Sequence, residues 1–123
     1  MDDAIKSLQE ELKIVKIAKV CHQANKAWCE VNGDFSQVDW EQASDDIKES
    51  AINGVSKVLD NPKVSFEEVH NIWLDYKLKE GWKYGPVKNA ELKQHPCIVP
   101  YNELPQKEKA KDILFRNIVI SLM

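Results

Sequence analysis

The chain has 123 residues, of which 43% are hydrophobic and 30% charged, a composition typical of one globular domain and not of a disordered segment. A formal net charge of −3 argues against a general nucleic-acid coat protein, so we expect no nucleic-acid polymer as a partner. This total hides an asymmetry. Residues 1–76 carry 8 Lys and Arg against 15 Asp and Glu, whereas residues 77–123 carry 9 against 5.

The sequence indicates neither a membrane protein nor a small protein stabilised by disulfide bonds. No stretch approaches the roughly 20 apolar residues of a membrane span, and the first residues lack the features of a signal peptide, so we expect a cytoplasmic protein without a membrane partner. The three cysteines, Cys21, Cys29 and Cys97, are odd in number and form no C-x-x-C pair. We therefore predict three reduced, mostly buried thiols, with no disulfide, no metal site and no cofactor.

The first predicted element is a long helix over residues 3–31, which Asn32 and Gly33 end. Its apolar stripe changes register along the helix. A heptad spacing comes first, at Ile5, Leu8, Leu12 and Val15. A second stripe follows, at Ile14, Ile17, Ala18, Cys21, Ala24 and Trp28. Two interpretations are open: residues 1–13 contact a partner subunit, or they fold against their own domain. We therefore divide the chain into an N-terminal helical extension, 1–13, and a single domain, 14–123.

The next two helices carry clear boundary signals. Residues 33–44 form a polar loop in which Phe35 and Trp40 are the expected apolar anchors. Ser44 begins a helix that Asn61 and Pro62 end, and Gly54 inside it suggests the close approach of another helix. The third helix begins with the capping box formed by Ser65 and Glu68. It runs to about Lys79, and Gly81 closes it.

Residues 82–101 are not predicted to form a helix, unlike the preceding segments, because Pro86, Pro96 and Pro100 interrupt any helix across them. Two short alternating runs, Trp82/Tyr84 and Cys97/Val99, predict a two-stranded hairpin or arch. Pro105 opens a last helix to about Leu122. Its predicted apolar stripe is Ala110, Ile113, Leu114, Ile118 and Leu122, widened by Phe115 and Val119. The predicted fold class is mainly α, with about four helices packed as one small domain and a short β element.

The segment 65–116 closely resembles the ryanodine-receptor repeat (RyR) domain. The matching motifs are His70-Asn71-x-Trp73, Gly81-Trp82-x-Tyr84-Gly85-Pro86-Val87-Lys88, Lys93, His95-Pro96, Val99-Pro100-Tyr101 and Leu104-Pro105. Upstream motifs resemble the stand-alone versions of bacteria and their phages: Ala18-x-Val20-Cys21-His22, Asn25, Gly33-Asp34 and Glu49-Ser50-Ala51-Ile52-Asn53-Gly54-Val55. The resemblance covers about residues 14–120.

The resemblance implies a mostly helical domain with short strands and no catalytic activity. In the calcium-release channel such repeats occur in tandem on the cytosolic assembly, away from the pore. For the family, recognition of a nucleotide or a nucleotide-derived ligand is a recurrent suggestion. This chain departs from the channel pattern in having one copy. If a complete site needs two repeats, a homodimer would supply it.

The residue types themselves permit an anionic ligand. Trp82 and Tyr84 alternate, so an extended segment would place both on one side, where they offer a stacking face to a ring. Nearby lysines offer point charges to phosphate. The candidate ligand-binding residues are Trp73, Trp82, Tyr84, Lys88, Lys93, His95, Tyr101 and Asn71. The alternative is that the aromatic residues only pack a core and the lysines form a solvated rim.

Nothing in the sequence indicates an enzyme, because no acid–base dyad, nucleophile elbow, phosphate loop or metal motif occurs. We interpret Cys97 as a packed thiol, and His70 and His95 as hydrogen-bonding residues that fix the 82–101 loop on the third helix. The predicted function is a non-enzymatic ligand-binding module for a small anionic, ring-bearing ligand such as a nucleotide. The alternative is a protein-interaction or scaffolding domain that acts through self-association or a partner protein.

Overall fold

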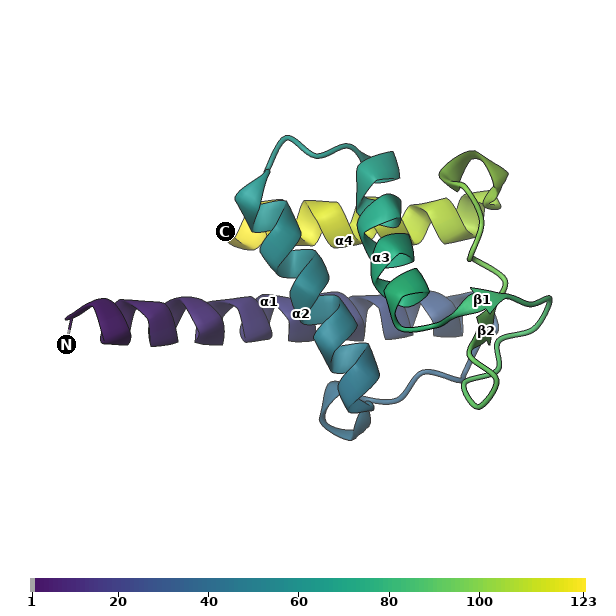
Figure 1. The fold of residues 1–123 in the computed structure, drawn as a ribbon, viewed down its shortest axis with the longest axis horizontal. Coiled ribbons are helices and arrows are strands. Elements are labelled where there is room, and N and C mark those ends of the chain that lie inside the picture. The colour runs from purple at the N-terminus through teal and green to yellow at the C-terminus, as the bar shows by residue number, and fades with distance from the viewer. Residues whose placement is uncertain (1) are drawn as a thin grey trace.

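A computed structural model describes residues 2–123. Four helices dominate it: α1 (Asp2–Val31), α2 (Asp45–Asp60), α3 (Phe66–Lys79) and α4 (Gln106–Leu122). α1 and α4 pack against each other, and α2 and α3 lie across them (Figure 1). The predicted mainly α class is confirmed. None of the helices in this described part of the chain is long and apolar enough to cross a bilayer.

The hydrophobic core lies where the four helices meet. Its buried members come from α1, α2, α3, α4 and the loops between them: Ile17, Ala18, Cys21, Trp40, Val55, Val58, Val64, Val69 and Val119. The predicted approach at Gly54 is confirmed, since a Cβ there would lie 2.9 Å from the Phe115 ring of α4. The second stripe of α1 therefore serves the core, as its spacing indicates.

Three residues that were predicted to make apolar contacts with the core are exposed instead. Trp40 is buried in a short 3₁₀ helix, Trp40–Gln42, but Phe35 is 73% exposed. The reason is local, because the Ser36 amide donates to the Asp34 carboxylate (2.9 Å) and this turn holds Phe35 at its apex. In α4, Val119 is the fully buried residue, while Ile113 and Leu122 are exposed. These two side chains line a shallow groove against α1 instead of the core.

The 82–101 segment forms a different β element from the predicted hairpin. β1 (Lys83–Tyr84) and β2 (Gln94–His95) pair in parallel, with Lys83 opposite Gln94 and Tyr84 opposite His95. A parallel pair excludes a hairpin, so the arch is the correct alternative. A second 3₁₀ helix, Tyr101–Glu103, then leads into α4.

A cap at the end of α3 fixes how the chain enters this arch. The Gly81 amide donates to the Leu78 carbonyl (3.1 Å), and the Trp82 amide donates to the Lys77 carbonyl (2.9 Å). With Gly81 at a φ of +89°, this is a Schellman motif, in which the residue after the glycine packs on the last turn of the helix. Trp82 accordingly lies against Lys77 and is buried, whereas Tyr84 is 56% exposed. The expectation that Trp82 and Tyr84 share one side is wrong, because the cap and not strand alternation orients Trp82.

Replacement of Gly81 by alanine tests this cap. Both Gly81→Ala and the matched control Gly33→Ala place a Cβ at a positive φ, +89° and +86°, with no heavy atom closer than 4.0 Å. We therefore expect each to lower the free energy of unfolding by about 1–2 kcal/mol in urea denaturation. Only Gly81→Ala should move the Trp82 indole signal in a ¹H–¹⁵N spectrum. An unchanged Trp82 signal would contradict the role given to the cap.

Candidate functional site

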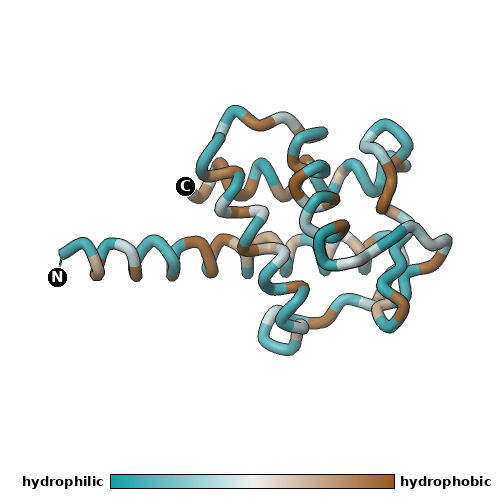
Figure 2. The backbone as a smooth tube through the Cα atoms, in the orientation of Figure 1, coloured by the Kyte–Doolittle hydropathy of each residue, from teal (hydrophilic) through white to brown (hydrophobic). Residues whose placement is uncertain are grey.

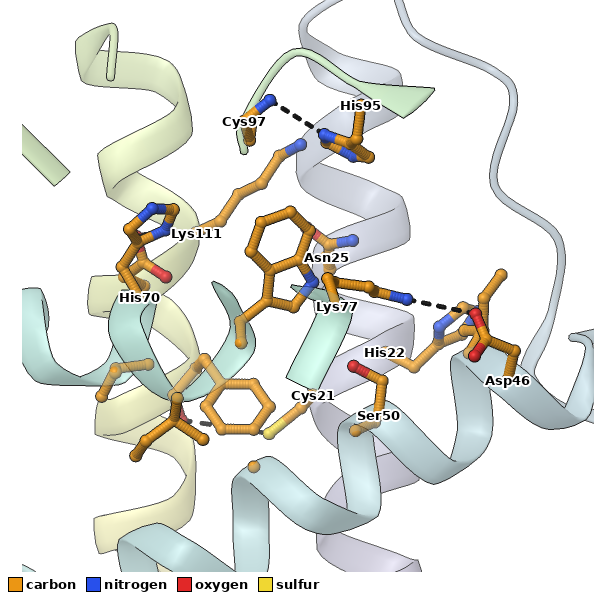
Figure 3. Close-up of a pocket in the computed structure, with 18 of the residues that line it drawn as sticks. Cys21, His22, Asn25, Asp46, Ser50, His70, Lys77, His95, Cys97 and Lys111 are labelled. Carbon is orange, nitrogen blue, oxygen red and sulfur yellow. Dashed lines mark hydrogen bonds and ion pairs between the residues drawn. The ribbon is translucent and has the colours of Figure 1, made fainter. Parts of the chain in front are cut away.

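A cavity of about 630 Å³ lies between the helices and the 82–101 arch. Its walls include Cys21, His22 and Asn25 of α1, Asp46 and Ser50 of α2, His70 and Lys77 of α3, and Lys111 of α4 (Figure 3). The arch contributes Trp82, Lys88, Lys93, His95 and Cys97. The volume falls within the range of about 300–1,000 Å³ that small-molecule sites occupy.

Lys77 and Trp82 form one wall of the cavity. Lys77 is buried, its ammonium lies 5.0 Å from the centre of the Trp82 ring, and it donates to the Asp46 carboxylate at 3.3 Å. The Trp82 Nε1–H is buried and finds no acceptor among the residues of the structure. Such an orphaned donor costs about 1–3 kcal/mol, so an acceptor supplied by a ligand would recover that free energy.

Aromatic rings and histidines form a second wall. The Trp73 ring lies 5.1 Å from His95 and 5.7 Å from His70, and the Trp82 ring lies 6.3 Å from His95. The Cys97 amide donates to His95 Nδ1 (2.9 Å), so the neutral ring carries its proton on Nε2. Burial, followed by the charges of Lys88 and Lys111, lowers the pKa of His95 to about 4. His95 is therefore neutral at pH 7.

His70 fastens the arch to α3. It is buried on α3, and its Nε2–H donates to the Val99 carbonyl at 2.8 Å. The predicted role of His70 as the residue that fixes this loop on the third helix is confirmed. His95 instead bonds within the loop, through the Cys97 amide, and reaches α3 only by its edge-on contact with Trp73.

Lysines from three elements bring positive charge to the cavity. Lys77 comes from α3, Lys88 from the arch and Lys111 from α4, and Lys111 extends toward His95 (Figure 3). Desolvation of its ammonium, together with Lys111 and Lys77, lowers the pKa of Lys88, although the nearby Asp34 acts against this shift. Lys93 also lines the cavity, but its ammonium is engaged with the Glu80 carbonyl (2.7 Å).

Two carboxylates of α4 balance part of this charge. Burial acts to raise the pKa of Glu108, but the Lys111 ammonium at 2.9 Å outweighs it and the net shift is downward. Cys97 lies 3.4 Å from Glu108, and desolvation and that carboxylate raise the pKa of its thiol to about 12. Burial raises the pKa of Asp112 to about 7, with Glu108 adding to the effect. Cys97 is thus a protonated thiol, and Asp112 titrates near neutrality.

The structure brings five of the eight candidate residues together. Trp73, Trp82, Lys88, Lys93 and His95 line the cavity. The other three lie outside its lining. Asn71 and Tyr84 are exposed on α3 and β1, and Tyr101 is half-buried, with its ring 6.1 Å from His70 and under the Lys109 ammonium.

The sequence did not indicate the cavity residues of α1 and α2, nor Lys77 of α3 and Lys111 of α4. Lys77 continues the buried row of His70 and Trp73 at helical spacing, and Lys111 precedes Phe115 and Val119 by one and two turns. A charged residue at helical spacing from the inward-facing residues of the same helix is the signal that would have identified Lys77 and Lys111. The free thiols expected at Cys21, Cys29 and Cys97 are confirmed, the first two being buried. Within residues 2–123 no three His, Cys, Asp or Glu side chains gather in a way that would hold a metal ion.

The buried carboxyl of Asp112 predicts a pH dependence of stability. The folded chain holds this proton up to about pH 7, whereas the unfolded carboxyl loses it near pH 4, so the protonated carboxyl's contribution to stability is lost as the pH rises from about 4 to about 7 and does not change further above that. Between pH 5 and 7.5, Asp112→Asn should remove this fall of the melting temperature. His95 contributes an opposing slope, because its ring is neutral in the folded chain and takes up a proton in the unfolded chain below about pH 6.5, but this contribution is the same in both proteins. The control Asp75→Asn, at an exposed position of α3, should retain the fall. An unchanged slope in Asp112→Asn would contradict this assignment.

The chain resembles one known family over most of this site. The family model described as RyR domain matches residues 46–121, which include α3, the arch and nearly all of α2 and α4, and therefore most of the cavity wall. α1 precedes the matched range, yet it supplies Ile17, Ala18 and Cys21 to the core. The match covers more than half of the chain, and the protein belongs to the RyR domain family.

Proposed function

We propose that the protein is a non-enzymatic binding module whose cavity takes a small anionic, ring-bearing molecule of the nucleotide kind. The observation that carries the proposal is the buried, unpaired Trp82 Nε1–H in a cavity that four lysines also line. A hydrogen-bond donor without an acceptor, next to ammonium groups, suits a phosphate or a carbonyl oxygen.

The aromatic residues and the lysines of the cavity have different roles in recognition. Trp73 and Trp82 offer faces or edges to a planar ring, and stacking on such side chains contributes about 1–3 kcal/mol per base in single-stranded nucleic-acid complexes. Lys88 is the cavity lysine with neither a hydrogen bond nor a salt bridge to the described residues. It is thus the one that can turn to a phosphate without breaking an existing pair, whereas Lys77 and Lys111 hold Asp46 and Glu108.

The protonation states support binding over catalysis. A thiol with a pKa of about 12 is a poor nucleophile at pH 7. An imidazole with a pKa of about 4 is a weak general base. The three free thiols also fit the reducing cytoplasm, where we place the protein.

A thermal-shift panel tests the proposal. Nucleoside mono- and diphosphates are compared with the free nucleoside and with inorganic phosphate, so that ring and phosphate contributions separate. A ligand at 100 times its Kd stabilises the native state by about 2.7 kcal/mol, which for a chain of this size means a rise of several degrees. Lys88→Ala should weaken binding about tenfold or more, since charged hydrogen bonds contribute about 1.5–3 kcal/mol.

The matched control is Lys83→Ala, an exposed lysine of β1 outside the cavity lining. It should leave the affinity unchanged. The proposal fails if no nucleotide raises the melting temperature at millimolar concentration, or if Lys83→Ala and Lys88→Ala weaken binding equally.

One observation favours an additional role in protein interaction. The heptad stripe of α1 has no partner within its own domain, because Ile5, Leu8 and Leu12 are more than half exposed. The interpretation that the N-terminal extension folds against its own domain is therefore wrong for residues 2–13, and Met1 lies outside the described residues.

A further inference from the structure

The N-terminal half of α1 projects from the domain as a free helix (Figure 1). Every residue from Asp2 to Lys13 is exposed, and hydrophobic positions recur along this otherwise hydrophilic stretch (Figure 2). Isolated helices of about 12–15 residues are marginal in water. This one is continuous with the anchored half of α1, so its nucleation is already provided.

The projecting helix presents a narrow apolar seam. Its residues are 38–57% exposed and occupy successive a and d positions of two heptads: Ile5, Leu8, Leu12 and Val15. The flanking e and g positions are polar or small: Asp2, Ala4, Gln9, Glu11 and Lys16. A seam confined to a and d is covered by one further helix, whereas larger bundles bury the e and g positions as well.

The chain itself limits the length of this seam. The next a and d positions are Lys19 and His22, one turn and two turns beyond Val15. Lys19 binds Glu41 (2.9 Å), and His22 donates to the Val38 carbonyl and packs on Trp40. The segment 38–41 therefore lies on the seam side of α1. A parallel partner helix, continuing alongside α1, would run into this segment.

We propose that two copies of the chain pair through residues 2–16 as an antiparallel two-stranded coiled coil. Ile5 then faces the partner's Val15, and Leu8 faces the partner's Leu12. The partner helix begins opposite Ala18, so it stops where the 38–41 segment starts. The two globular domains lie at opposite ends of the paired region, and neither obstructs the other.

The flanking charges agree with this register. In antiparallel pairing e positions face e positions and g positions face g positions, which places Lys16 beside the partner's Asp2 twice in the dimer. The same register places Glu11 beside the partner's Glu11, a single repulsive contact. Parallel pairing would set Glu11 beside the partner's Lys16 instead. Exposed ion pairs of this kind are weak, so the obstruction by residues 38–41 decides between the two orientations.

A membrane surface is a less suitable occupant of the seam. Residues 2–16 carry Asp2, Asp3, Glu10 and Glu11 against Lys6, Lys13 and Lys16. Helices that lie on anionic membranes are typically rich in basic residues on the polar face, and this one is not.

Sedimentation equilibrium tests the pairing. The native chain should approach twice its 14.2 kDa mass as its concentration rises. Leu8→Gln combined with Leu12→Gln should remain at the single-chain mass, with unchanged thermal stability of the monomeric domain. Val31→Gln, which alters the exposed apolar residue at the far end of α1, is the matched control and should pair as the native chain does. A native chain that stays monomeric, a trimeric mass, or a monomer that binds anionic vesicles would overturn the proposal.

Three further variants test the orientation. In oxidising conditions a mixture of Leu8→Cys and Leu12→Cys chains should form disulfide-linked dimers, whereas each variant alone should not. Glu11→Gln should strengthen pairing, because it removes the repulsion at the centre of the antiparallel dimer. Cross-linking of Leu8→Cys with itself, or weaker pairing by Glu11→Gln, would show a parallel dimer and overturn the assigned geometry.

Discussion

A lysine ammonium buried between an indole ring and a carboxylate is the interaction on which the site depends. Lys77 occupies the last turn of α3, the Schellman cap brings Trp82 back over it, and Asp46 approaches from the first turn of α2. A buried charge without its partners costs several kcal/mol, so these three residues hold one another in place. The start of α2, the end of α3 and the entry to the arch are fixed together as a result.

The consequence of this arrangement is a donor without an acceptor. Lys77 is engaged by the Trp82 ring face and by Asp46, while the Trp82 Nε1–H is left unpaired in the cavity wall. The acidic N-terminal part of the chain and the basic C-terminal part meet here, through the Lys77–Asp46 pair. The cavity is thus not simply basic. It holds paired charges, one lysine free to turn to a ligand, and a neutral imidazole.

Local sequence signals predicted most of the fold, because helix boundaries depend on few residues. The capping box at Ser65, the glycine stops at Gly33 and Gly81 and the close approach at Gly54 all occur as predicted. The arch was predicted less well. Alternation at Trp82 and Tyr84 indicates a shared face, but the cap of α3, which involves Lys77 five residues earlier, decides where Trp82 points.

Apart from Trp73 on α3, the site was predicted only on the segment that differs from a regular helix. The predicted residues lie in a Pro-rich loop: Trp82, Lys88 and His95. Aromatic and basic residues in a loop of this kind are readily recognised as candidate ligand contacts. The sequence did not indicate the charged residues on helices, namely Lys77, Lys111 and Asp112. A charged residue on a helix is ordinarily exposed to solvent, and only the tertiary packing of the helices places these three at the cavity. Likewise, the register change in α1 indicated two different contacts, but the limit that residues 38–41 set on the seam depends on a loop that the sequence does not place.

In the proposed site, the Trp82 Nε1–H donates to the bound ligand. A ¹H–¹⁵N titration with nucleoside mono- and diphosphates measures this directly, and Trp28 provides an internal reference because its Nε1–H already donates to the Lys107 carbonyl at 2.9 Å. The predicted result is a saturable shift of the Trp82 indole signal with little change at Trp28. Equal shifts of the two signals, or no shift at Trp82 with any of these nucleotides, would contradict the proposed site.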